Sequence, residues 1–152
     1  FQKNRRIDPM CLSIALKRSE DVLAKGTHLG FEWMVIHNAM GFRYGYVKVP
    51  SGHPWHGKGY DEIDANVHGG LTFADYDVLC DQGGSDGGYW IGFDCAHAGD
   101  APDPALNTEE PFMQKLFGGY GEVRSQAYVE AECLDLCEQA RSVVVLNERK
   151  EP

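Results

Sequence analysis

The stretch GYWIGFDCAHAGD, residues 88–100, decides the fold because apolar and polar side chains alternate along its first half. Side chains of a β-strand point alternately to its two faces. One face of a strand over 88–95 carries Tyr89, Ile91, Phe93 and Cys95, and the other carries Trp90, Gly92 and Asp94. The alternation predicts a strand that packs one face on a core and turns a glycine, between an indole and a carboxylate, the other way.

A second stretch, VHGGLTFADYD at 67–77, has a similar pattern and predicts a strand over 66–73. If the two strands pair as a hairpin, Gly70 and Gly92 form a floor without side chains, where a ligand can approach the backbone. The residues that rim this floor are His68, Thr72, Trp90 and Asp94. In the alternative, the glycines only curve the sheet and His68 is hydrogen-bonded to Asp94.

The segments on either side supply the other elements. FEWMVIH (31–37) and FRYGYVKV (42–49) predict a hairpin around NAMG (38–41). Apolar periodicity predicts helices over 11–26 and 122–144, and PFMQKLF (111–117) predicts a short helix. The apolar stripe of the 122–144 helix is Val129, Cys133, Leu136, Cys137, Ala140 and Val144. We therefore expect an α+β fold, with a four-stranded, mainly antiparallel sheet and N- and C-terminal helices packed on one face.

Length and charge limit the classes of protein. The 152 residues suit a single domain, which we place at 10–152, and we expect residues 1–9 to be a vector-derived tail. The formal net charge of −9 argues against direct binding to nucleic acid or to anionic membranes, and it suits a basic protein partner or simple solubility. Cysteines without a disulfide spacing indicate a reducing, cytoplasmic location. The oligomeric state is left open.

Polar residues of the loops extend the candidate site. His53, Trp55 and His56 lie in a long loop over 50–64, and His97 and Asp100 follow the 88–95 strand. Histidine, cysteine and aspartate are usual zinc ligands, so zinc is one candidate cofactor, but no spacing matches a zinc motif. In the alternative, His53 and His56 hydrogen-bond the loop backbone. Cys95 has the apolar parity, so we read it as a buried thiol rather than as a nucleophile.

These stretches also carry a family resemblance. The segments GYVKVPSGHP, VHGGLT and GFDCAHAGD resemble motifs of an uncharacterised family of small bacterial and phage proteins, over about 45–104. The resemblance implies no established reaction. It places His53, Pro54, His68, Gly69, Gly70, Asp94, Cys95, His97 and Asp100 in the family's motifs, and the chain departs from the family mainly over 74–87.

Two functions follow as hypotheses. In the first, the chain binds a small polar or nucleotide-like ligand, and if it is an enzyme, it is a hydrolase. The catalytic candidates are His68, Asp94 and His97, with His68 or His97 as the base and Asp94 orienting a histidine. The ligand-binding candidates are His53, Trp55, His56, Gly70, Thr72, Trp90, Gly92 and Asp100. In the second, an acidic, phage-encoded interaction protein inhibits a host defence factor without catalysis.

Overall fold

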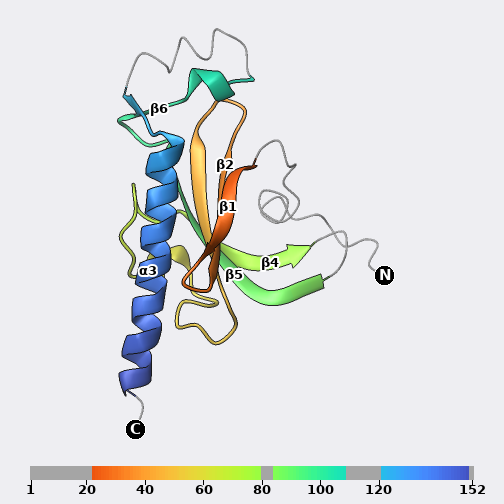
Figure 1. The fold of residues 1–152 in the computed structure, drawn as a ribbon, viewed down its shortest axis with the longest axis vertical. Coiled ribbons are helices and arrows are strands. Elements are labelled where there is room, and N and C mark those ends of the chain that lie inside the picture. The colour runs from red at the N-terminus through yellow and green to blue at the C-terminus, as the bar shows by residue number, and fades with distance from the viewer. Residues whose placement is uncertain (1–21, 80–83, 109–120, 151–152) are drawn as a thin grey trace.

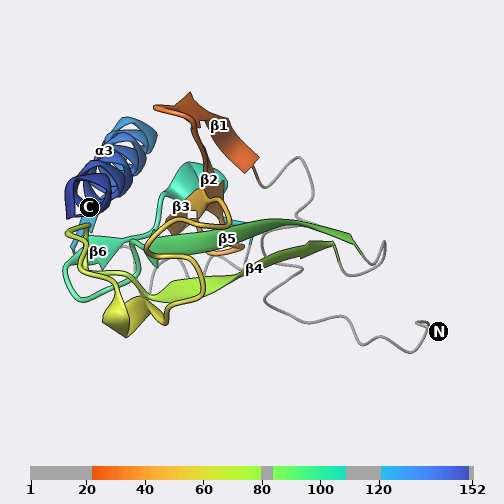
Figure 2. The same ribbon diagram turned by 90° about the horizontal axis from the view of Figure 1, so that it is seen from below.

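The computed structural model describes residues 22–79, 84–108 and 121–150. Within these residues the main sheet has five strands, in the order β1-β2-β3-β5-β4, and all neighbours are antiparallel. The long helix α3 lies along β1, β2 and β3, while the β4–β5 hairpin extends away from it (Figure 1, Figure 2). The elements are β1 (Val22–His28), β2 (Phe31–His37), β3 (Arg43–Val49), η3 (Tyr60–Glu62), β4 (Phe73–Leu79), β5 (Gly84–Asp94), β6 (Asp100–Ala101), η4 (Pro104–Leu106), β7 (Glu122–Val123) and α3 (Gln126–Lys150).

The first strand corrects a sequence prediction. The helix predicted over 11–26 is wrong from residue 22 onward, where β1 pairs with β2, and residues 11–21 lie outside the described residues. Leu29 and Gly30 join the two strands with φ angles of 55° and 87°. A two-residue hairpin turn of type I′ requires positive φ at both central residues. The sheet therefore has five strands, one more than predicted, because this turn returns the chain onto β2.

The β2–β3 hairpin confirms its prediction, and the β4–β5 hairpin does so only in part. Asn38 Oδ1 closes the β2–β3 loop by accepting the N–H groups of Met40, Gly41 and Phe42 at 3.0, 3.0 and 3.1 Å. The strand predicted over 66–73 is wrong, because β4 begins only at residue 73. The last predicted strand, over 88–95, is contained almost entirely in β5.

Helix α3 and the sheet share a continuous apolar core. The helix predicted over 122–144 is confirmed, although α3 begins after Ser125, whose Oγ accepts the Tyr128 N–H at 3.1 Å as an N-cap. Apart from Val144, the predicted helix stripe shares one apolar cluster with the predicted apolar face of β5, and α3 itself lies mainly against β3 and β2. The core members from these two faces are Val129, Cys133, Leu136, Cys137, Ala140, Tyr89, Ile91, Phe93 and Cys95.

Glycines within the strands make room for aromatic rings. Gly45 is paired with Phe93, and Gly92 with Tyr46. A Cβ atom on either glycine would collide with the ring of its partner, so each glycine admits a ring rather than a ligand. The predicted glycine floor at Gly92 is therefore wrong, since Tyr46 covers it. Trp90, on the same face, is buried in a second apolar cluster with Ile36, Tyr46 and Phe73.

The remaining predictions about the chain's organisation are tested only in part. The 1–9 tail and the short helix over 111–117 lie outside the described residues. The domain limits of 10–152 stay a prediction. In the part of the chain that the structure describes, no helix is both long and apolar enough to cross a bilayer.

Candidate functional site

Predicted site residues meet where the 67–72 turn, the loop after β5 and the start of α3 come together. Because Gly69 and Gly70 have φ angles of 69° and 83°, residues 67–72 form a turn, closed by the Gly70 N–H to Val67 O at 2.9 Å. The predicted strand parity of His68, Gly70 and Thr72 therefore does not apply. The predicted residues that lie in this region are His68, Gly70, Thr72, Asp94, His97 and Asp100.

His68 belongs to a closed histidine–aspartate pair. Its Nε2 lies 2.9 and 3.0 Å from the two carboxylate oxygens of Asp100, and its Nδ1 lies 2.9 Å from the Tyr128 hydroxyl. Because a carboxylate only accepts, Nε2–H donates to Asp100, and Nδ1 is hydrogen-bonded to the Tyr128 hydroxyl. The backbone N–H of His68 donates to Glu132 at 2.7 Å. Both ring nitrogens are used, so the alternative of a His68–Asp94 pair is also wrong.

Asp100 is the centre of this closed pair, with a side chain only 1% exposed. It accepts hydrogen bonds from Arg124 Nε at 2.8 Å and from the His97 N–H at 3.0 Å, besides that from His68. Burial by itself raises the pKa of the Asp100 carboxyl, but the hydrogen bonds from Arg124, His68 and the His97 N–H outweigh it and hold that pKa below its usual value. Asp100 is therefore a buried, ionised and well-satisfied carboxylate.

Asp94 and His97 form a second pair, which is open. His97 Nε2 lies 3.2 Å from Asp94 Oδ1, and the two side chains are 36% and 23% exposed. Asp94 is held by Thr72 Oγ1 at 3.0 Å and by the Ala96 N–H at 3.1 Å. His97 Nε2 is nevertheless buried and makes no hydrogen bond in the structure. A buried ring nitrogen without a hydrogen bond is uncommon and points to strain, a ligand or a catalytic role.

The two pairs are neighbours. The ring centroids of His68 and His97 are 6.3 Å apart, and the His97 ring lies against the backbone of Gly69. A Cβ atom at Gly69 would collide with the His97 ring, whereas one at Gly70 would meet nothing within 4 Å. Gly69 therefore sets the position of the His97 ring, and Gly70 serves the turn alone.

The loop residues predicted to bind a ligand lie elsewhere. His53 is buried, and its Nε2–H donates to Ala140 O of α3 at 2.9 Å while Nδ1 accepts the Trp55 N–H at 3.0 Å. Burial lowers the pKa of His53, partly opposed by the hydrogen bond to Ala140. The His56 ring packs beside Tyr76 and Tyr89. The alternative, that His53 and His56 hydrogen-bond the loop backbone, is confirmed for His53 by the Trp55 N–H and stays a prediction for His56.

Neither a thiol nucleophile nor a metal centre is supported. Burial raises the pKa of Cys95 to about 12, so this thiol stays protonated at neutral pH. Among the described residues, no three histidine, cysteine, aspartate or glutamate side chains are grouped as metal ligands would be.

Sequence reasoning missed three residues that complete the closed pair: Arg124, which precedes α3, and Tyr128 and Glu132, which lie in its first turns. Tyr128 and Glu132 are four residues apart and therefore lie on one side of α3, which is a signal that the sequence does contain. The Glu132 carboxylate accepts the His68 N–H. Tyr128 also stacks beside the Arg124 guanidinium, at 5.5 Å.

The fold and the cluster together define an α+β chain with two adjacent histidine–aspartate pairs. Comparison of this chain with protein-family models, with curated proteins and with solved structures finds no match.

Proposed function

We propose that the chain binds a small polar ligand at the open pair, His97 and Asp94, and hydrolyses it with His97 as the general base. The observation that carries this proposal is the buried Nε2 of His97, which lies beside a carboxylate but makes no hydrogen bond. Catalytic hydrogen bonds are often poorly aligned before a ligand is bound and improve in the complex. The rest of the cluster is saturated, so His97 is the histidine available to a ligand.

The surroundings suit a base. Thr72 and the Ala96 N–H hold Asp94 in place, 3.2 Å from His97 Nε2, so a small realignment when a ligand binds would let Asp94 accept the Nε2–H. Nδ1 then carries the free lone pair, and no hydrogen bond from the described residues occupies it. In the hydrolytic step, Nδ1 takes a proton from water, the water oxygen bonds to the electrophilic carbon, and the leaving group departs with that proton. The formal net charge of −9 favours a neutral ester or amide over a phosphorylated ligand.

The test uses p-nitrophenyl acetate as a generic ester and compares two matched histidines. His28 is 33% exposed and lies 3.3 Å from Glu138, while His97 is 36% exposed and lies 3.2 Å from Asp94. We expect His97→Gln to lower the rate above background by about 10²-fold, the lower end for a general base, and His28→Gln to leave it unchanged. Equal rates for the two variants and the unaltered chain would disprove hydrolysis by His97.

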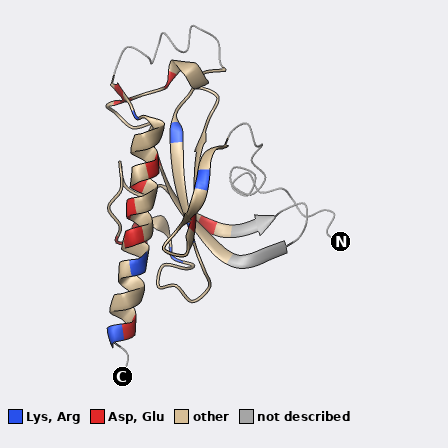
Figure 3. Cartoon of the chain, viewed as in Figure 1, with Lys and Arg blue, Asp and Glu red and all other residues tan. Residues whose placement is uncertain are grey.

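One observation favours the second candidate, an interaction protein for a basic partner such as a host defence factor. Carboxylates line the N-terminal half of α3, and two of them, Asp135 and Glu138, are exposed (Figure 3). If this face is the functional one, affinity for a polylysine probe falls with salt and falls further in Asp135→Asn/Glu138→Gln. His97→Gln would leave that affinity unchanged, which separates the two proposals.

A further inference from the structure

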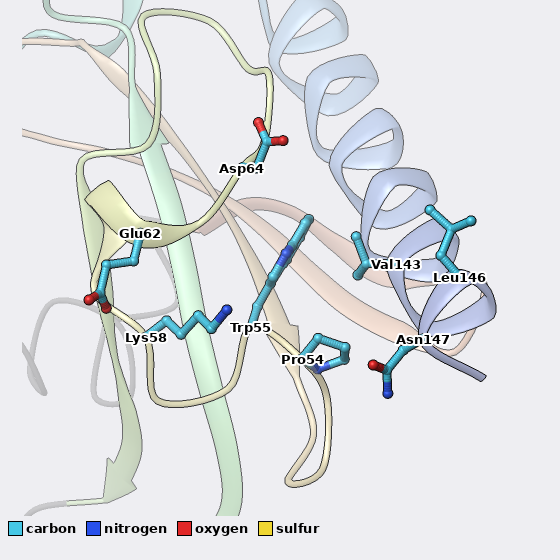
Figure 4. A pocket seen from close by; sticks show the side chains of 8 residues that line it. All are labelled: Pro54, Trp55, Lys58, Glu62, Asp64, Val143, Leu146 and Asn147. Carbon is cyan, nitrogen blue, oxygen red and sulfur yellow. The ribbon is translucent and has the colours of Figure 1, made fainter. Parts of the chain in front are cut away.

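A pocket far from the histidine pairs lies between the 50–64 loop and the last turns of α3 (Figure 4). Its volume is about 250 Å³. Sites for drug-sized ligands usually span about 300–1,000 Å³, so a ligand here would be small. Apolar side chains of Trp55, Val143 and Leu146 form its walls. Such a wall favours an aliphatic or aromatic group.

The pocket is already formed in the free chain. Trp55 is 4% exposed and therefore fixed in the core. Its loop is attached to α3 through His53, which bonds to Ala140 O at 2.9 Å and to the Trp55 N–H at 3.0 Å. Glu62 is also held, because it accepts the Gly59 N–H at 2.9 Å. A preformed wall lowers the conformational cost of binding.

Three charged side chains flank the apolar wall, Lys58, Glu62 and Asp64, and of these Glu62 is already bonded to the Gly59 N–H. Lys58 and Asp64 both line the pocket, and Figure 4 shows the Lys58 chain reaching toward the indole and Asp64 beyond its outer edge. No hydrogen bond or ion pair engages either charged group in the structure's described part. Lys58 is thus available for an anion and Asp64 for a cation.

We propose that this pocket binds a small zwitterion with an apolar side chain, of the class of free aliphatic amino acids. Lys58 takes the carboxylate, Asp64 takes the ammonium group, and the side chain packs against Trp55, Val143 and Leu146. Charged groups give such a site its specificity, while the apolar wall supplies most of the contact area. The proposal is independent of the proposed function at His97.

The experiment is calorimetric titration of the full chain with L-leucine, isocaproate, which lacks the ammonium group, and isoamylamine, which lacks the carboxylate. We expect L-leucine to bind at least tenfold more tightly than either analogue. Lys58→Gln should remove the preference over isoamylamine, and Asp64→Asn should remove the preference over isocaproate. Asp61→Asn, an exposed neighbour that does not line the pocket, is the matched control and should change nothing.

Two outcomes would overturn the inference: no saturable binding of L-leucine, or binding that Lys58→Gln and Asp64→Asn leave unchanged. The variant His97→Gln should bind L-leucine as the unaltered chain does. Failure of this pocket therefore leaves the proposal for His97 standing, and loss of ester hydrolysis in His97→Gln says nothing against the pocket.

Discussion

Two histidine–aspartate pairs lie side by side in this protein. They consist of the same two residue types but differ in exposure and in hydrogen bonding. The side chains of His68 and Asp100 are 13% and 1% exposed, whereas those of His97 and Asp94 are 36% and 23% exposed. Both ring nitrogens of His68 have partners, while His97 Nε2 makes no hydrogen bond. The difference shows that a histidine's role depends on how many of its hydrogen bonds the fold already satisfies.

The neighbours explain why one pair is closed. Asp100 receives hydrogen bonds from Arg124 and from the backbone of His97, so its charge is compensated on several sides. Asp94 is held instead by a hydroxyl and one backbone N–H. The closed pair ties the 67–72 turn to α3, and the open pair stands on that rigid base. Rigid support is what a ligand-binding histidine requires.

Removing the centre of the closed pair should have the largest effect. In Asp100→Ala, Arg124, His68 and the His97 N–H lose a shared acceptor, and at about 1–3 kcal/mol for each donor left unsatisfied the summed loss should exceed that of any variant that removes one partner. Urea denaturation measures the free energy of unfolding. Asp100→Asn, which keeps the size of the side chain, serves if the alanine variant does not fold. A loss below about 1 kcal/mol in both variants would mean that Asp100 is not the structural centre described here.

Truncating the two histidines tests the comparison directly. His68→Ala leaves buried partners on Asp100 and Tyr128, and we expect a loss of about 1–3 kcal/mol in stability. His97→Ala removes a partly exposed ring without a hydrogen bond, and we expect a change within about 0.5 kcal/mol. Thermal and urea unfolding of both variants provide the measurement. Equal losses would remove the distinction between a closed and an open pair.

Local periodicity explains what the sequence could predict. The faces of β5, the β2–β3 hairpin and the apolar stripe of α3 follow from alternation or helical spacing, which neighbouring residues determine. Strand β1 could not be predicted, because its turn puts Leu29 at a φ of 55°, where a branched side chain is uncommon. The start of β4 was misplaced because Gly69 and Gly70 form a turn within a strand-like pattern.

The candidate site was predictable only as a neighbourhood. His68, Asp94, His97 and Asp100 do gather, since the start of β4 pairs with the end of β5, which brings the segment before β4 beside the segment after β5. Which histidine pairs with which aspartate depends on Arg124 and Tyr128, contributed by the distant start of α3. Such pairing is a tertiary contact, and spacing along the chain does not determine it.

Two adjacent glycines offer a smaller, matched test of the open pair. Gly69 and Gly70 both have positive φ, so an alanine at either position costs about 1–2 kcal/mol in backbone strain. Only Gly69→Ala also displaces the His97 ring. We therefore expect similar losses of stability in both variants, but a loss of p-nitrophenyl acetate hydrolysis in Gly69→Ala alone. Equal hydrolysis by the two variants would show that the ring position does not matter.

The smallest expected effect is the pH dependence that comes from a third histidine, His53. Like His68, His53 has a hydrogen-bond partner at each ring nitrogen. Burial lowers the pKa of folded His53, so the unfolded chain, with a histidine pKa of about 6.5, takes up a proton more readily. The contribution of neutral His53 to the stability of the fold is therefore complete above about pH 6.5. It is lost as the pH falls from there to the lowered pKa of the folded state. Thermal unfolding between pH 7.5 and 5 should show a shallow decline, and His53→Gln should flatten it while lowering stability throughout. If stability declines equally steeply with pH in His53→Gln, the decline comes from other histidines. The imidazole bonded to Ala140 O would then contribute nothing to the pH dependence of stability.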